Sequence, residues 1–257
     1  MSALPQADPR ARTWPQQGSP RIEGLLFDLD GTLLHTAPDI ARALNAALAE
    51  SGLAALPADH VARLIGRGAP MLVQRAYAAL GVAGDSTAAQ AATLERFFAH
   101  YDELASAPVE GAPPSASRTV AFDGVVEGLR GLSALGLRMG VVTNKQHRFA
   151  VALLQRLGLY AHFQVVVGGD TCKQRKPDPE PLLYGCSKLG LSPAHVLMVG
   201  DSVNDVQAAR AAAMPVICVP YGYNEGQDPR ELPCDHLIAS IAELPALLEA
   251  AAAKPRS

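Results

Sequence analysis

The segment that decides the fold of this chain is Leu25-Leu26-Phe27-Asp28-Leu29-Asp30-Gly31-Thr32. A short, continuous apolar run is typical of a buried strand in a parallel sheet. In open α/β sheets, ligands bind beyond the carboxyl ends of the strands. Asp28 and Asp30 lie at such an end, where a buried charge needs a partner. The segment therefore predicts a strand whose carboxyl end faces a metal ion, a phosphoryl group or both.

The composition of the chain restricts the class of partner. The chain has 257 residues, 49% of them hydrophobic, and a formal net charge of −3. This length and apolar content suffice for a large domain or a domain with a second module. The charge lacks the basic excess that nucleic-acid and anionic-membrane partners require. No apolar stretch reaches the roughly 18 residues of a membrane helix, so we expect neither a nucleic-acid nor a membrane partner.

The cysteines and residues 1–20 indicate the cellular compartment that we expect for the protein. The four cysteines show neither a C-x-x-C pair nor the spacing of a zinc site; they are Cys172, Cys186, Cys218 and Cys234. We expect reduced thiols and a cytoplasmic protein. Residues 1–20 contain no apolar region of a secretory signal, and their composition predicts a disordered tail.

Residues 37–120 have a helical pattern that interrupts the α/β part of the chain. Apolar side chains recur at helical spacing from Pro38 to the Ser51-Gly52 stop, and further helices are expected at 59–65, 70–80 and 87–104. A Pro-, Ala- and Ser-rich loop, Ala107–Ser117, follows. Because this block follows the first strand, we expect a helical cap over the carboxyl edge of the sheet.

The remainder of the chain alternates between strands and helices. Strands are expected at 139–142, 163–167, 196–199, 216–219 and 236–238, and helices at 125–135, 148–157, 179–189, 204–212 and 241–252. This alternation favours an α/β fold with a doubly wound, parallel, Rossmann-like sheet. We assign residues 21–36 and 121–257 to this core.

Polar residues follow several of the predicted strands and could converge at one edge of the sheet. Thr143 and Asn144 end the second strand, Asp201 follows the fourth with Asp205 four residues later, and Lys176 precedes a proline between the third and fourth. Carboxylates with other oxygen donors suit Mg²⁺, and a hydroxyl and a lysine suit a phosphate. An aspartate can also act as a nucleophile that forms an aspartyl-phosphate.

Each of these residues has an ordinary explanation when it stands alone. Thr143 could cap a helix, Lys176 could be a solvated lysine, and Asp205 could be a favourable acid in a helical first turn. An EF-hand loop is excluded because its sixth position would be Leu33 rather than glycine. The occurrence of all the groups in order at strand ends favours phosphoryl transfer.

The chain resembles the haloacid dehalogenase superfamily of phosphatases in four motifs. They are D-x-D-G-T at Asp28–Thr32, the strand-terminal Thr143, Lys176 before proline, and G-D-x-x-x-D at Gly200–Asp205. The resemblance implies that Asp28 is the nucleophile and Asp30 the general acid and base. It implies that Thr143 and Lys176 hold the phosphoryl group. It also implies that Asp28, the Asp30 carbonyl and Asp201 bind Mg²⁺. Asp205 would support these ligands without binding the ion itself.

Other segments are similar to the bacterial phosphoglycolate phosphatases within this superfamily. They are Ala37-Pro38-Asp39, Val142–Lys145, Gly168-Gly169-Asp170, Gly200–Asp205 and Tyr221–Asn224. The resemblance implies hydrolysis of 2-phosphoglycolate to glycolate and phosphate, with Gly31, Thr32 and Asn144 near the substrate. Arg67, between two glycines in the helical insertion, is a candidate to bind the substrate carboxylate.

Three features depart from the pattern of these relatives. His35 stands where most relatives have an acidic residue, and the loop Pro108–Ser117 is longer than usual. Ala213 replaces the usual glycine before Met214-Pro215, which costs about 1 kcal/mol if that position is left-handed.

Two alternatives remain open at this point. A related phosphatase could act on a sugar phosphate or another small phosphomonoester. A phospho-accepting receiver domain also uses Asp, Thr, Lys and Mg²⁺, but it is about half as long and needs no second carboxylate two residues after the first. The sequence is compatible with either a monomer or a homodimer.

Overall fold

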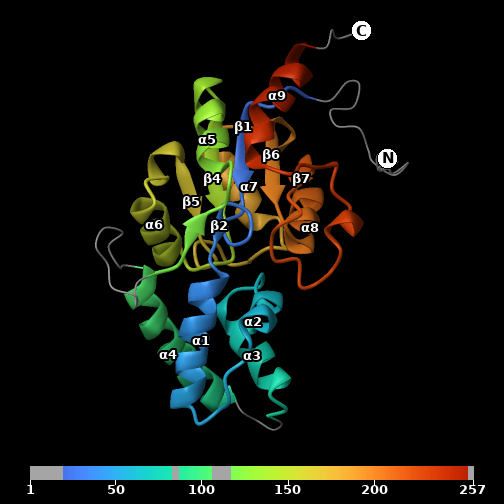
Figure 1. Ribbon diagram of the computed structural model, residues 1–257. Helices are drawn as coiled ribbons and strands as arrows, with labels where there is room; N and C mark the ends of the chain where they lie inside the picture. Colours follow the sequence, from blue (N-terminus) through green and yellow to red (C-terminus); the bar gives the residue numbers. More distant parts are fainter. Residues whose placement is uncertain (1–19, 83–86, 106–116, 254–257) are drawn as a thin grey trace, which may run out of the picture.

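The computed structural model describes residues 20–82, 87–105 and 117–253. These residues form a sheet covered by helices on both faces and a separate layer of helices beside one edge of that sheet (Figure 1). The predicted tail lies outside the described residues except for Pro20. The predicted loop Pro108–Ser117 also lies outside them except for Ser117.

Six strands form a parallel sheet with the first strand near its centre. Their spatial order is β5 (Val165–Val167), β4 (Arg138–Val142), β1 (Gly24–Phe27), β6 (Val196–Gly200), β7 (Val216–Cys218) and β8 (His236–Leu237). Every neighbouring pair is parallel. The predicted α/β fold class is therefore confirmed.

Helices pack on both faces of this sheet. One face carries α5 (Val125–Ala134), α6 (His147–Arg156) and α9 (Leu244–Ala253), and the other carries α7 (Glu180–Leu189) and α8 (Val203–Ala211). Leu25 and Phe27 belong to the apolar cluster on the first face, and Leu26 belongs to the cluster on the second. Because side chains alternate between faces, burial on both sides requires the continuous apolar run seen in β1.

Four helices form the second layer. They are α1 (Ala37–Glu50), α2 (Ala58–Leu64), α3 (Ala69–Ala79) and α4 (Thr87–Ala105). Pro38 lies in the first turn of α1, where its missing N–H costs nothing. The helix buries Leu44 and Leu48 completely, mainly against α4. Burying a leucine side chain contributes about 2 kcal/mol, so this apolar stripe holds the layer together. The layer faces the carboxyl ends of the strands (Figure 1).

A two-stranded antiparallel ribbon connects the two layers. It pairs β2 (Leu34–His35) with β3 (Val120–Ala121), the segments through which the chain enters and leaves the helical layer. The sequence pattern did not predict it, because strands of two residues show no periodicity. The boundary that we predicted between residues 120 and 121 falls inside β3; the division into two domains stays a prediction.

Short 3-10 helices account for the remaining differences from the predicted elements. They are η1 (Tyr160–His162), η2 (Pro193–His195), η3 (Pro229–Glu231) and η4 (Ile241–Glu243). The predicted strand at 163–167 begins only at Val165, after η1, and the predicted last helix is divided into η4 and α9.

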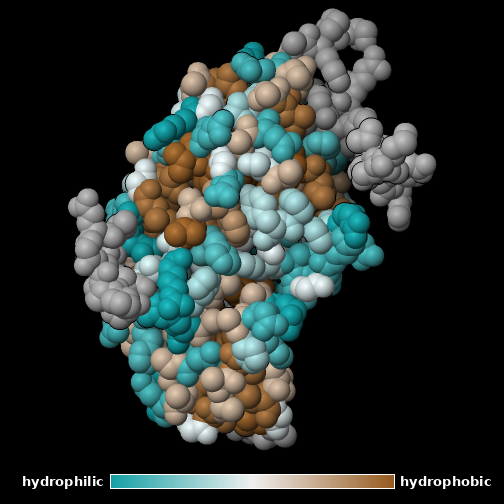
Figure 2. Space-filling model, in the orientation of Figure 1, coloured by the Kyte–Doolittle hydropathy of each residue, from teal (hydrophilic) through white to brown (hydrophobic). Residues whose placement is uncertain are grey.

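The surface shows polar and apolar side chains in a mixed pattern. Figure 2 shows an apolar group at the lower end of the helical layer and mostly hydrophilic side chains where this layer meets the α/β layer. None of the described helices combines the length and the apolar character that crossing a membrane requires.

Candidate active site

Three neighbouring strands bring the predicted site residues together. Asp28 directly follows β1, Thr143 follows β4 and Asp201 follows β6, and β1 pairs with both of the other strands. All three residues are buried or nearly so, with exposed fractions of 9%, 3% and 2% for the whole residues. The parallel topology therefore places groups that are up to 173 residues apart in the sequence at one edge of the sheet.

Lys176 lies at the centre of this edge. Its Nζ donates to Asp28 Oδ1, Asp205 Oδ1 and the Val142 carbonyl oxygen, each at 2.7 Å. An ammonium group has three donors, so these acceptors satisfy all of them. Burial by itself lowers the pKa of Lys176, but the attraction of Asp205 and Asp28 outweighs it and raises the pKa above its ordinary value. Lys176 therefore stays charged.

Asp205 is held by the start of α8. It is the third residue of the helix and forms a capping box with Ser202, whose backbone N–H and hydroxyl both donate to Asp205 Oδ2. The Asp201 N–H donates to the same oxygen at 3.2 Å, and Lys176 occupies the other oxygen. Since both oxygens already accept strong hydrogen bonds, this geometry suits a supporting group better than a direct ligand.

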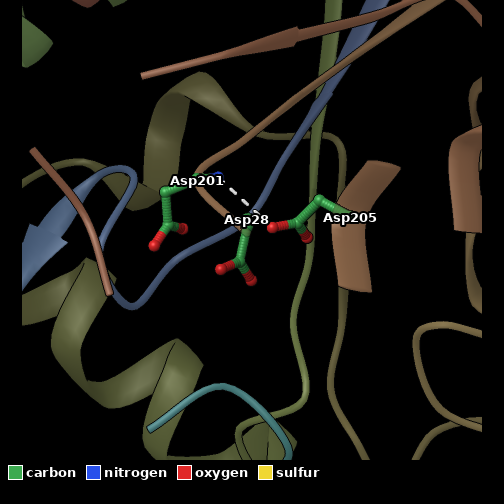
Figure 3. Close-up of side chains that lie close together, drawn as sticks. All are labelled: Asp28, Asp201 and Asp205. Atoms are coloured by element: carbon green, nitrogen blue, oxygen red, sulfur yellow. Dashed lines mark hydrogen bonds between the residues drawn. The ribbon is translucent and has the colours of Figure 1, made fainter. Parts of the chain in front are cut away.

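Asp28, Asp201 and Asp205 form a carboxylate cluster that could hold a cation. One oxygen from each of the three lies within 4.8 Å of the others, and the side chains converge (Figure 3). Burial, opposed by Lys176, raises the pKa of Asp28 to about 6. Burial and the charges of Asp28 and Asp205 raise the pKa of Asp201 well above its ordinary value.

The charge of this cluster fits a dication. When all three carboxylates are ionised, they and the single ammonium of Lys176 carry a net charge of −2 in a buried space, which also explains why the pKa values of Asp28 and Asp201 are raised. Such a group of oxygen donors suits a hard divalent cation such as Mg²⁺. The residues present therefore fit the predicted metal.

Asp30 has a partner that the sequence did not reveal. Lys145 Nζ lies 2.9 Å from both Oδ1 and Oδ2 of Asp30. The Lys145 side chain is only 6% exposed, and its Nζ lies 4.6 Å from the centre of the Tyr101 ring of α4. The sequence indicates Lys145 only as the last residue of the Val142–Lys145 segment, because a lysine in a loop shows no partner until the fold supplies one.

A cavity separates the sheet edge from the helical layer and contains several of the predicted residues. Its polar lining consists of Asp28, Asp30, Tyr101, Thr143, Asn144, Lys145 and Gln146. Its apolar lining includes Ile40, Ile65, Leu72, Phe97, Phe98 and Phe149. Both layers therefore contribute to the cavity.

Asn144 connects the two layers at this cavity. Its Nδ2 donates to the Gly66 carbonyl of the helical layer at 3.0 Å and to the Lys176 carbonyl of the core at 2.9 Å. Both amide donors are thus used within the protein. The role of Asn144 in substrate binding stays a prediction.

Gly31 and Thr32, also predicted near the substrate, are not among the lining residues and lie against Asp201 instead. The Thr32 hydroxyl donates to Asp201 Oδ1 at 2.7 Å, and the Tyr223 N–H donates to Asp201 Oδ2 at 2.6 Å. Gly31 has a φ of +96°, and a Cβ there would lie 2.4 Å from Asp201 Oδ2. Only glycine can therefore bring the loop this close to the carboxylate.

Arg67 is not among the residues that line the cavity, although its neighbours Gly66 and Gly68 are. Its Nε donates to Glu225 Oε1 at 3.1 Å, and Arg75 Nη2 occupies Glu225 Oε2 at 3.0 Å. The Arg67 side chain is 45% exposed. The structure does not bring this residue together with the other predicted site residues, and its role in carboxylate binding stays a prediction.

The loop around His35 accommodates this unusual residue. His35 Nδ1 and Tyr223 Oη are hydrogen-bonded at 2.8 Å, and Tyr223 Oη also accepts from the Ala37 N–H at 3.0 Å. The His35 ring packs near Phe122, with ring centres 5.4 Å apart. The exchange for an acidic residue therefore concerns the connection into α1 and Tyr223, whose N–H binds Asp201.

Comparisons with known proteins find relatives over most of the chain. The family model described as haloacid dehalogenase-like hydrolase matches residues 25–219. The chain is 44% identical over 222 residues to the phosphoglycolate phosphatase of Thiobacillus denitrificans, covering 86% of this chain and 93% of that protein. It is 42% identical over 229 residues to that of Nitrosospira multiformis, covering 89% and 96%.

A solved structure supports the same relationship. The crystal structure of a predicted phosphoglycolate phosphatase from Haemophilus somnus matches with a TM-score of 0.77 and 30% identity, covering 88% of this chain and 98% of that one. The family model, the two relatives and this structure thus agree over most of the chain. The chain therefore belongs to the haloacid dehalogenase-like hydrolase family.

Proposed function

We propose that this protein is a Mg²⁺-dependent phosphomonoester hydrolase that converts 2-phosphoglycolate to glycolate and phosphate. The observation that carries the proposal is the Asp28 carboxylate, held by Lys176 at 2.7 Å on the wall of a cavity that also contains Asp30. The names of the relatives from Thiobacillus denitrificans and Nitrosospira multiformis support the choice of substrate.

Asp28 is the proposed nucleophile. With a pKa of about 6 it is largely ionised at neutral pH, and Lys176 holds one of its oxygens in a fixed position. An oxygen of Asp28 attacks phosphorus while the bond to the leaving alkoxide breaks, which gives an aspartyl-phosphate. Thr143, which also lines the cavity, is the proposed donor of a hydroxyl hydrogen bond to the phosphoryl group.

Asp30 is the proposed proton carrier. In its acid form it gives a proton to the leaving alkoxide, and in its base form it takes a proton from the water that hydrolyses the aspartyl-phosphate. General acid–base catalysis of this kind contributes typically 10²–10⁴-fold in rate. Lys145 orients Asp30 by binding both of its oxygens.

Asp28, the Asp30 carbonyl and Asp201 would hold Mg²⁺. Asp205 would support them through its hydrogen bonds to Lys176 and the Asp201 N–H. When bound, the cation neutralises the negative charges that the carboxylates and the phosphoryl group bring together. The apolar cavity walls from the helical layer exclude bulk water from these groups. Gly31 and Thr32 keep Asp201 in place.

A small phosphorylated metabolite is thus the proposed partner, and we propose a cytoplasmic monomer or homodimer. The formal net charge of −3 supports a partner other than nucleic acid or an anionic membrane. Light scattering after size exclusion distinguishes the monomer from the dimer.

The test of this function is the release of phosphate from a panel of small phosphomonoesters, with Mg²⁺ and with EDTA. The panel contains 2-phosphoglycolate, neutral esters and sugar phosphates. We expect many turnovers per chain and the highest kcat/KM on 2-phosphoglycolate. A higher kcat/KM on a sugar phosphate would show that the substrate is a sugar phosphate and not 2-phosphoglycolate. A single phosphorylation per chain would favour a receiver-type domain.

A pair of variants tests the nucleophile in the same assay. Asp28→Asn removes the attacking oxygen and is expected to abolish turnover. Asp59→Asn, at a side chain that is 73% exposed, is the matched control and is expected to retain full activity. Turnover by Asp28→Asn at the wild-type rate would refute the mechanism.

A further inference from the structure

The cavity must bind more than the phosphoryl group of its substrate. In 2-phosphoglycolate a carboxylate lies at the other end of the molecule, and a buried carboxylate requires donors that replace water. Much of the wall beyond Asp28 is apolar, including Ile40, Leu72 and Phe98. The polar groups in this wall are therefore the candidates for carboxylate recognition.

Lys145 is the one cationic side chain among the described residues that line the cavity. Its ammonium has three donors, and the two oxygens of Asp30 engage at most two of them. At least one donor is therefore left for a further acceptor. An anion beside Lys145 would gain a charge-assisted hydrogen bond, which is stronger than a neutral one.

Tyr101 supplies an unused hydroxyl at the same place. Tyr101 lines the cavity and is only 1% exposed, yet no described residue meets its hydroxyl at hydrogen-bonding distance and angle, although the charge of Lys145 acts on it. A buried polar group without a partner is rare in folded proteins and calls for an explanation, such as a ligand. Burial raises the pKa of Tyr101 to about 12, so the hydroxyl keeps its proton and can donate.

The position of both groups is set by the packing of the two layers. The Tyr101 ring, on α4, stacks on Phe97 with centres 5.5 Å apart and meets Phe149 of α6 edge-on at 5.1 Å. Lys145 belongs to the loop that precedes α6, and its Nζ lies over the Tyr101 ring. The Tyr101 ring and the Lys145 ammonium are thus held together by contacts that do not involve a ligand.

The two other residues predicted to bind the substrate through side-chain donors are already used or lie elsewhere, and Gln146 in the lining is an uncharged donor. Both amide donors of Asn144 bind backbone carbonyl groups, and Arg67 is paired with Glu225 outside the lining. We propose that Lys145 Nζ and Tyr101 Oη form a subsite that binds the carboxylate of the substrate and thereby selects carboxylate-bearing phosphomonoesters. This inference rests on the proposed function, of which it specifies the substrate class.

The experiment compares two substrates of equal chain length, 2-phosphoglycolate and 2-hydroxyethyl phosphate, which lacks the carboxylate. Tyr101→Phe removes one oxygen and keeps the ring packing. We expect it to lower kcat/KM on 2-phosphoglycolate by about tenfold or more, the value of a hydrogen bond to a charged group. On 2-hydroxyethyl phosphate we expect a change of less than about twofold.

Two further variants separate recognition from other effects. Lys145→Met also releases Asp30 and is expected to lower kcat/KM on both substrates. The loss on 2-phosphoglycolate should be about tenfold greater than the loss on 2-hydroxyethyl phosphate. Tyr77→Phe is the matched control, because its hydroxyl binds Thr93 at 2.8 Å and Tyr77 is not a lining residue. We expect this control to leave the ratio of the two kcat/KM values unchanged.

The outcomes distinguish the subsite from the proposed function. Equal losses on both substrates, or no loss, in both Tyr101→Phe and Lys145→Met would overturn the subsite. The wild-type protein could instead prefer another phosphomonoester that bears a carboxylate, such as 3-phosphoglycerate. If Tyr101→Phe reduces that preference, the subsite is supported and 2-phosphoglycolate is excluded as the preferred substrate. A wild-type preference for neutral esters would overturn the subsite.

Discussion

Lys176 Nζ lies 2.7 Å from Asp205 Oδ1, inside the core and 29 positions away in the sequence. The same ammonium binds Asp28, so a single lysine connects the proposed nucleophile with the first turn of α8. Its side chain is 2% exposed, and those of Asp28 and Asp205 are 12% and 1% exposed. Removing one member of such a buried group leaves the others without compensation.

Lys176→Met is therefore expected to destabilise the protein as well as to inactivate it. The free energy of unfolding in urea, measured without Mg²⁺ at neutral pH, should fall by about 3–5 kcal/mol. Lys188→Met, at an exposed lysine on α7, is the control and should change it by less than about 0.5 kcal/mol. Similar values for the two variants would contradict a structural role for Lys176.

Asp39 should make the connection between the layers sensitive to acid. Its carboxylate, in the first turn of α1, accepts hydrogen bonds from Ser117 Oγ, the Arg118 N–H, and the Thr119 N–H and hydroxyl. Burial raises the pKa of Asp39, but these bonds outweigh it and lower the pKa below its ordinary value of 3.8. The stabilisation is thus complete above the ordinary pKa and is lost as the pH falls through the lowered one.

Asp39→Asn tests this contribution. The amide group turns a donor toward backbone donors, so the free energy of unfolding should fall by about 2–3 kcal/mol at pH 7. The difference from the wild-type protein should shrink below pH 3.8, where the wild-type carboxyl also begins to bind a proton. Urea unfolding across pH measures both effects, and a difference that is constant with pH would contradict the assignment.

Mg²⁺ should stabilise the protein through the carboxylate cluster. A ligand at ten times its Kd adds about 1.4 kcal/mol to the free energy of unfolding, which corresponds to a few degrees in Tm for a chain of this size. We expect this shift in differential scanning fluorimetry for the wild-type protein and Asp59→Asn, and its loss in Asp201→Asn. NaCl at equal ionic strength is the control. A shift retained in Asp201→Asn would place the cation elsewhere.

Ala213 should be replaceable by glycine with a gain in stability. It has a φ of +55°, the left-handed region that the sequence comparison with relatives suggested for this position. Relief of the steric cost exceeds the entropic penalty of glycine, so Ala213→Gly should raise the free energy of unfolding by about 0.5–1 kcal/mol. Ala211→Gly, at an exposed α8 residue, should lower it by a similar amount. A loss of stability in both variants would contradict the explanation.

The sequence determined the sheet and most of the site. The run Leu25–Phe27 is apolar without alternation because both faces of β1 are covered, and this requirement is visible in the sequence. Asp28, Thr143 and Asp201 could be predicted as neighbours because parallel strands end at the same edge. The helical insertion could be predicted because its 3.6-residue periodicity is local.

Only the tertiary structure decided which side chains meet across the two layers. Lys145 binds Asp30 and lies over Tyr101, although these residues belong to three different segments. Arg67, which had the local features of an anion-binding residue, is paired with Glu225 instead. Periodicity and motifs describe local backbone structure, whereas the partner of a long charged side chain depends on how helices pack over a sheet. That packing is a long-range property, so the carboxylate subsite that we propose could be identified only after the helical layer was in place.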